Sequence, residues 1–248
     1  MKKFVSLLLA LLMIASLAAC GKKANDNNNS NDSKTLIMGT SADYAPFEFM
    51  YKGEDGTMQY GGIDVSVGQY IAESMGKELK VENMSFDYLL PSLVKGDFDI
   101  VIAAMEADGD RLKSADFSGK SVAAQTGTTK LDIVNEQLTG ANAVPLALVT
   151  DMVNELVNGK VDAILVDGAV AKQYAETNKD LVIADASSEL GAAQPYCVAV
   201  AKGDPKGLLP AINAAIAKMN EENKLESFIS AADALKDVWQ EVTPENPS

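Results

Sequence analysis

The chain has 248 residues, a formal net charge of −14, no histidine and two cysteines, Cys20 and Cys197. So acidic a protein is repelled by nucleic acids and by anionic lipid surfaces. The lack of histidine excludes Ser-His-Asp triads, Cys-His pairs and most zinc sites, and we expect neither a metal nor a cofactor. Two cysteines cannot build a disulfide framework, and Cys197 lies in an apolar run that predicts a core position.

The N-terminus predicts an export signal. Two lysines precede an almost wholly apolar run, residues 4–19, whose end reads LAAC and closes at Cys20. Such a segment is too short for a lasting transmembrane helix and is typical of a lipoprotein signal peptide. We therefore predict that residues 1–19 are removed and that lipid on Cys20 anchors the protein to the outer face of the cell membrane. The alternative is an ordinary cleaved signal in which the cysteine is incidental.

The segment that follows, residues 20–34, has Ala24 as its only aliphatic residue. It cannot bury apolar surface, so we predict a disordered tether and a folded body that starts near Thr35. Strand and helix patterns then alternate, which is typical of α/β folds. Strands are predicted at residues 36–39, 79–81, 99–104, 122–125, 143–146, 161–166, 181–183 and 196–201.

Helices are predicted between these strands from apolar residues at helical spacing. Asp64 is expected to cap the first helix and Gly76 to end it, residues 88–94 form a second helix closed by Gly96, and Thr150 caps a later one. Two further helices follow the last strand. The apolar stripes are Val67, Tyr70, Ile71 and Met75; Leu131, Val134 and Leu138; Met152, Leu156 and Val157; Leu209, Ile212, Ile216 and Met219; Leu225, Phe228, Leu235 and Trp239.

Arg111 is the only arginine among the 21 basic residues of the chain. Its planar guanidinium can hold a carboxylate through two parallel hydrogen bonds, which lysine cannot reproduce. It follows a predicted buried strand by a short loop, which is where ligands bind in open α/β sheets. The sequence weighs a carboxylate-binding role and an incidental surface position equally.

Other candidate residues also follow predicted strands. The turn TGTT, residues 126–129, offers backbone donors and hydroxyls to an anion. Asp167 offers a carboxylate to an ammonium group, whereas Tyr44 and Phe47 offer aromatic walls to a pocket. Helix capping is the alternative for the turn and for Asp167, and core packing is the alternative for the aromatics. Together with Arg111, the set matches the charges of a free α-amino acid.

Seven segments, in order, resemble the polar amino-acid solute-binding proteins of ABC importers, which form family 3 of the extracellular solute-binding proteins. The segments are GTSADYAPFEF, YGGIDVSVGQYIAESMG, FDYLLPSLVKGDFDIVIAAM, DRLKSADFS, VAAQTGTT, VDAILVDGAVA and PYCVAVAKGD. The resemblance implies an α/β fold of the periplasmic-binding-protein type II, in which two lobes close on a ligand. It places lobe 1 at residues 35–118 and 203–248, and lobe 2 at residues 119–202.

Carried over position by position, the resemblance also implies the ligand contacts. Arg111 and Thr129 correspond to residues that bind the α-carboxylate of the ligand, and Asp167 to the residue that binds its α-ammonium group. The ligand side chain would be enclosed by Tyr44, Phe86 and Ser41. Cys20 and the polar tether match the lipoprotein members of the family.

The acidic residues Glu106 and Asp108 depart from the family pattern, which usually has hydroxyl-bearing residues or proline there. Glu106 directly follows a predicted strand, so we expect it to face the ligand as a further binding residue. An unpaired carboxylate at such a place is costly unless a cation meets it. This departure predicts a cationic ligand, arginine or lysine.

A second departure is a missing segment after Ser118, where the family normally has one of two inter-lobe crossings and a strand of lobe 2. Its absence predicts a smaller second lobe in which the strand at residues 196–201 loses its sheet neighbour.

The sequence therefore predicts a monomeric, lipid-anchored binding protein that is not an enzyme. It would capture a free amino acid and deliver it by hinge closure to the permease and ATPase of an ABC importer. One alternative is an amino-acid-sensing or adhesin lipoprotein without a transport role. The other, less favoured, is a dehydratase-type enzyme on the same fold, with Glu106 or Asp108 as its acid–base group.

Overall fold

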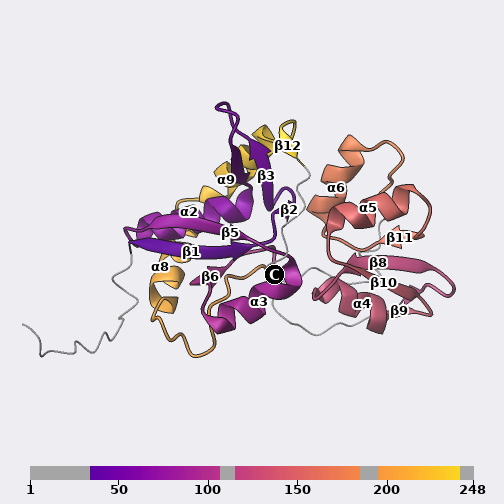
Figure 1. The fold of residues 1–248 in the computed structure, drawn as a ribbon, viewed down its shortest axis with the longest axis horizontal. Coiled ribbons are helices and arrows are strands. Elements are labelled where there is room, and N and C mark those ends of the chain that lie inside the picture. The colour runs from indigo at the N-terminus through magenta and orange to yellow at the C-terminus, as the bar shows by residue number, and fades with distance from the viewer. Residues whose placement is uncertain (1–33, 107–114, 185–194, 241–248) are drawn as a thin grey trace, which may run out of the picture. The chain divides into compact units, whose positions relative to one another are not determined.

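The structure, a computed structural model, describes residues 34–106, 115–184 and 195–240 (Figure 1). The predicted signal peptide, Cys20 and nearly all of the tether lie outside these residues, as do Asp108 and Arg111. Within the described ranges, no helix combines the length and the apolar character that a membrane crossing needs.

The first βα series forms a parallel sheet with β1 at its centre. The sheet order is β5 (Glu78–Asn83), β1 (Thr35–Thr40) and β6 (Ile100–Val101). Its helices are α2 (Ile63–Ser74), α3 (Phe86–Lys95), α8 (Leu209–Glu221) and α9 (Lys224–Ala234). Leu36 and Met38 pack in one apolar cluster with α2 and α8, whereas Ile37 packs in another with α3. Because both faces of the sheet are covered at its centre, β1 and β6 are largely apolar, whereas β5 at the edge alternates charged and apolar residues.

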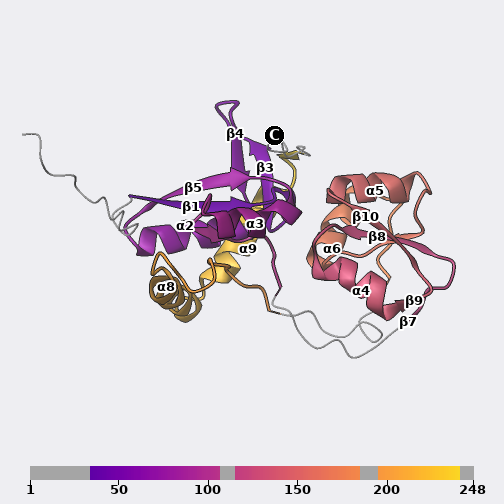
Figure 2. The same cartoon turned by 60° about the horizontal axis from the view of Figure 1, so that its bottom comes forward.

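The second βα series forms a separate parallel sheet. Its order is β10 (Asn142–Leu146), β8 (Ser121–Gln125) and β11 (Ala163–Ile164), and its helices are α4 (Thr129–Gln137), α5 (Val149–Val157) and α6 (Gly168–Thr177). Figure 2 shows α4 and α5 on opposite faces of this sheet. Val134 of α4 packs with Val122 and Ala124, whereas Met152 of α5 packs with Ala123, so alternate residues of β8 serve the two faces.

An antiparallel sheet was not predicted. It contains β2 (Asp43–Tyr44), β3 (Glu48–Lys52), β4 (Met58–Gly61) and β12 (Trp239–Gln240). In β12, Trp239 pairs with Tyr51 of β3. The prediction that Trp239 extends the last helix is therefore wrong, because α9 ends at Ala234.

The junction after Ser118 is short and well paired. β7 (Ala115–Asp116) lies parallel to β9 (Leu138–Thr139). The backbone N–H groups of Phe117 and Gly119 donate to the carbonyls of Thr139 and Gly140, at 2.9 and 3.1 Å. The chain then enters β8 directly, with no intervening strand.

Residues 196–201 differ from the prediction. They form no continuous strand, but Tyr196 and Ala199 make isolated antiparallel bridges to Glu106 and Val101. The prediction that this segment loses its neighbour is thus wrong. Val198 and Val200 pack in the cluster of α2 and α8, so the segment extends the first sheet. The division into lobes stays a prediction, and this packing favours an end of lobe 2 before Tyr196. Cys197 is only partly buried, not a core residue.

Several local expectations are confirmed and others are wrong. Gly76 and Gly96 follow α2 and α3 with φ of 66° and 96°, as a helix end requires. Neither Asp64 nor Thr150 caps a helix, because α2 begins after Gly62 and α5 after Leu148. The strands predicted at residues 99–104 and 161–166 shorten to two residues each, and residues 181–183 form no strand.

Candidate functional site

A cavity of about 300 Å³ lies where strands of both parallel sheets end. Carboxyl ends of parallel strands are the usual ligand edge of α/β sheets, and this volume suits a small molecule. The cavity lining includes six of the predicted ligand residues: Ser41, Tyr44, Phe86, Glu106, Thr129 and Asp167. Arg111 lies outside the described residues.

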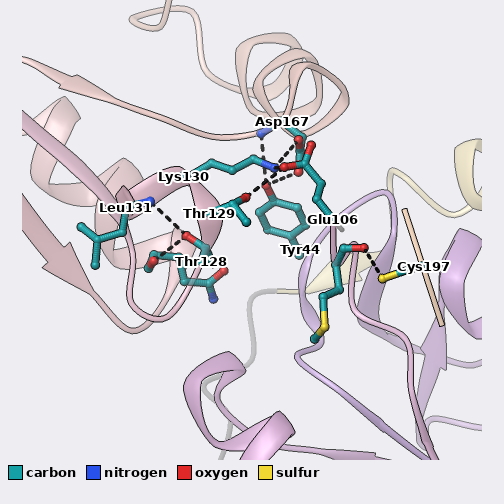
Figure 3. Close-up of polar contacts among 10 residues, drawn as sticks. Tyr44, Glu106, Thr128, Thr129, Lys130, Leu131, Asp167 and Cys197 are labelled. Carbon is teal, nitrogen blue, oxygen red and sulfur yellow. Dashed lines mark hydrogen bonds and ion pairs between the residues drawn. The ribbon is translucent and has the colours of Figure 1, made fainter. Parts of the chain in front are cut away.

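The cavity lining also includes a lysine, Lys130, that the sequence interpretation missed. The Nζ of Lys130 lies 2.8 Å from the Oε2 of Glu106 and 2.8 Å from the Oδ1 of Asp167 (Figure 3). The Lys130 side chain is 12% exposed and the two acids 6% each. The premise that Glu106 is unpaired is therefore wrong, because the chain supplies its own cation. The sequence signal that could have identified Lys130 as a site residue was its position directly after the TGTT turn.

The first turn of α4 positions this contact. Thr128 caps the helix: its Oγ1 donates to the carbonyl of Gln125 at 2.6 Å and accepts from the N–H of Leu131 at 3.3 Å. The hydroxyl of Thr129 donates to Glu106 Oε2 at 2.9 Å. The Glu106 carboxylate thus lies at the N-terminus of α4, where the helix dipole favours an anion. The capping interpretation of the TGTT turn is confirmed for Thr128, whereas binding of a ligand anion by Thr129 stays a prediction, because its partner here is the protein's own Glu106.

Asp167 precedes α6, but its side chain makes no capping hydrogen bond. Instead, the hydroxyl of Tyr44 donates to its Oδ2 at 2.8 Å, and the backbone N–H of Asp167 donates to the Tyr44 oxygen at 3.1 Å. Burial and the negative charge of Asp167 raise the pKa of Tyr44 well above its ordinary value, so the phenol keeps its proton. Tyr44 therefore orients Asp167 toward the cavity as well as forming a wall.

The remaining predicted residues are Ser41, Phe86 and Phe47, and each has its own contacts. The Ser41 hydroxyl donates to Asp43 Oδ1 at 2.9 Å. Phe86 begins α3 and is partly buried in its cluster. Phe47 stacks on Tyr44 with ring centroids 6.1 Å apart and is absent from the cavity lining, so core packing is its role. No set of three potential metal ligands gathers anywhere in the part of the chain that the structure describes.

Three buried acids, Glu48 in the cavity lining and Asp43 and Asp64 bonded to lining residues, were also missed by the sequence interpretation. Burial raises the pKa of Asp43 and of Asp64 to about 6 each. Glu48 is 0% exposed and lines the cavity, and its carboxyl group shares a hydrogen bond with the Asp64 side chain. Burial, followed by the negative charge of Asp64, raises the pKa of Glu48 well above its usual 4.5. For Glu48, the sequence signal of a buried acid was its position in the mostly apolar run that forms β3.

Glu48→Gln is expected to stabilise the protein increasingly as pH rises. Because its pKa is raised in the folded state, Glu48 favours folding only while protonated, and this contribution is lost as pH rises above about 4.5. The melting-temperature gain of the variant over the wild type should therefore be larger at pH 8 than at pH 5. The exposed Glu54→Gln serves as control, and equal gains at both pH values would contradict the assignment.

Comparisons with known proteins bear on this site. A family model described as bacterial extracellular solute-binding proteins, family 3, matches residues 36–230. The arginine-binding extracellular protein ArtP of Bacillus subtilis is 30% identical, with 92% of this chain and 96% of that protein covered. The glutamine-binding protein GlnH of the same organism is 26% identical, with the same coverage.

Solved structures agree in fold. An amino acid ABC transporter substrate-binding protein from Streptococcus pneumoniae, bound to L-arginine, matches with a TM-score of 0.70 and 30% identity, covering 84% of this chain and 96% of that chain. AbpA from the same organism, also bound to L-arginine, matches with a TM-score of 0.73 and 27% identity, covering 82% and 96%.

Proposed function

The chain belongs to the bacterial extracellular solute-binding proteins of family 3, and from this premise we propose that it captures a cationic amino acid, arginine or lysine. Its fold is the α/β periplasmic-binding-protein fold of type II. It is an extracytoplasmic amino-acid-binding subunit of an ABC importer and not an enzyme, so the dehydratase alternative is wrong. No observation favours the sensor alternative.

The observation that carries the choice of ligand is the arginine bound by relatives that match nearly their whole length. ArtP is named as arginine-binding, and two solved relatives hold L-arginine. The charges of the site allow this ligand: Glu106 and Asp167 balance Lys130 and the proposed Arg111, so no net positive charge repels a cationic side chain.

Each group of the ligand has a proposed partner. Asp167 binds the α-ammonium group, because Tyr44 already holds its carboxylate toward the cavity. Thr129 and Arg111 bind the α-carboxylate, and Tyr44, Phe86 and Ser41 surround the ligand side chain. Closure of two lobes on the ligand would then deliver it to the permease and its ATPase, with the protein acting as a monomer.

The shortened junction after Ser118 belongs to the same proposal. The match to ArtP spans 258 positions although it covers 92% of this 248-residue chain, which supports a segment missing from this chain. We propose that the direct entry from β7 into β8 shortens one connection of the hinge and leaves the cavity lining in place.

The lipid anchor at Cys20 is proposed from the sequence, since residues 1–33 lie outside the described part. A tether between the anchor and the body would keep the binding site near a permease without fixing its orientation. Metabolic labelling with a fatty acid tests it: a protein that takes up no label, or that still takes it up as Cys20→Ser, would refute the anchor.

The ligand proposal is tested by thermal-shift screening of the 20 amino acids, followed by calorimetry. Arginine and lysine at about 100 times their Kd should stabilise the protein by about 2.7 kcal/mol, which raises the melting temperature by several degrees. Stabilisation by glutamine or glutamate, with no effect of arginine or lysine, would contradict a cationic ligand and leave the binding function intact.

A further inference from the structure

Two side chains of the protein contact the residues that the proposed function assigns to the charged groups of the ligand. The Lys130 ammonium contacts Asp167, where the α-ammonium group of an amino acid is expected. The Glu106 carboxylate accepts the hydroxyl hydrogen of Thr129, where the α-carboxylate is expected. The two side chains also contact each other at 2.8 Å, so one ammonium and one carboxylate lie together in the cavity (Figure 3).

This pair is held from both sides. The cap by Thr128 fixes the first turn of α4, which carries Lys130 and donates through Thr129 to Glu106. Tyr44 fixes Asp167 on the other side. The Lys130, Glu106 and Asp167 side chains are all nearly buried, in contrast to the exposed ion pairs elsewhere, such as Lys172 with Glu176 at 74% and 49% exposure. Loose surface pairs contribute little, whereas a buried, hydrogen-bonded pair holds its geometry.

We infer that the pair of Glu106 and Lys130 is an internal mimic of the ligand's α-carboxylate and α-ammonium groups, and that it sets the affinity of the site by competing with the ligand. The inference rests on the proposed function, because that function assigns Asp167 and Thr129 to the ligand. An amino acid binds by taking the place of Lys130 on Asp167 and of Glu106 on Thr129. The displaced side chains remain paired with each other, so no buried charge is left alone.

The charges of the pair allow competition with the ligand to be distinguished from a purely electrostatic effect on affinity. Glu106 and Lys130 together are neutral, so removing both leaves the net charge of the cavity unchanged. A change in affinity on removing both therefore reports competition rather than charge. A site that is blocked most of the time binds its ligand more weakly in proportion to the fraction of time it is open.

The test is calorimetry of arginine binding to the full chain and to the double variant Glu106→Ser with Lys130→Ala. If the pair leaves the site open about one tenth of the time, the double variant should bind arginine about tenfold more tightly. Each single variant should gain less than the double, since one competing group remains. The matched control is Lys172→Ala with Glu176→Ser, which removes an exposed pair on α6 and should leave the affinity unchanged.

The outcomes separate the two proposals. Equal or weaker arginine binding by a double variant that still unfolds cooperatively would overturn the mimic, and it would mean that Glu106 or Lys130 contacts the ligand. Binding by the wild type in that case leaves the proposed function standing. If neither the wild type nor the folded double variant responds to any of the 20 amino acids, both the mimic and the proposed function are wrong. Binding by the double variant alone would support the mimic as a complete block.

Discussion

Asp167→Asn is expected to weaken arginine binding by about 100-fold while the protein stays folded, which corresponds to about 2.7 kcal/mol. The substitution keeps the shape of the side chain and an oxygen that accepts from Tyr44. It removes the negative charge that holds an ammonium group in a nearly buried place, where breaking an ion pair costs about 3–5 kcal/mol. Because Lys130 loses the same partner, its competition weakens too, so the expected loss lies slightly below that range.

The measurement is calorimetry with arginine, accompanied by thermal unfolding of the ligand-free variant. Asp180→Asn is the control, since Asp180 is exposed just after α6 and should bind arginine as the wild type does. An affinity of Asp167→Asn within threefold of the wild type would place the ligand's ammonium group elsewhere in the cavity.

The parts of the fold that sequence could predict are those whose information is local. The strands β1, β8 and β10 are largely apolar runs, β5 alternates charged and apolar residues, and Gly76 and Gly96 are the residues that a left-handed helix end favours. The antiparallel sheet around β3 was missed because its pattern is confused by the buried Glu48 and because β2 and β12 have only two residues each. So short a strand is specified by its partner, not by its own sequence.

The predictions that Asp64 and Thr150 cap helices failed for a related reason. Asp64 sits in the first turn of α2 with the chemistry of a cap, yet its carboxylate accepts the backbone N–H of Ala104 at 2.6 Å, across 40 residues of sequence. Thr150 likewise falls one residue inside α5. A local pattern indicates that a polar side chain can satisfy a nearby donor, but it does not indicate whether a distant donor competes for it.

The site shows the same division. The rule that ligands bind at the ends of parallel strands selected Tyr44, Asp167 and the turn that contains Thr129, and the family resemblance added Ser41, Phe86 and Glu106; all six line one cavity. It could not select Lys130, because a lysine in the first turn of a helix is usually a solvated side chain. Only the meeting of the α4 N-terminus with Glu106 and Asp167 makes this lysine an occupant of the site. That meeting also changes the meaning of Glu106 from an unpaired charge to half of an ion pair.

Arg111→Lys is expected to weaken arginine binding by at least about tenfold, although it conserves the charge. A lysine ammonium can replace the attraction of a guanidinium but not its two parallel hydrogen bonds to a carboxylate, each worth about 1.5–3 kcal/mol when charged. The loss of one such bond accounts for about tenfold or more. Calorimetry with arginine measures the loss, and unchanged affinity would refute a carboxylate-binding role for Arg111.

A ligand without the carboxylate makes this test specific. Agmatine is arginine with its carboxylate replaced by hydrogen, so it offers Arg111 nothing to hold but still presents an ammonium group to Asp167. The penalty of Arg111→Lys should therefore vanish with agmatine, whereas the penalty of Asp167→Asn should persist. If Arg111→Lys weakens agmatine and arginine equally, Arg111 acts on the site through folding or closure and not through the carboxylate. The two variants and two ligands thus assign one charged group of the amino acid to each residue, which no single substitution can do.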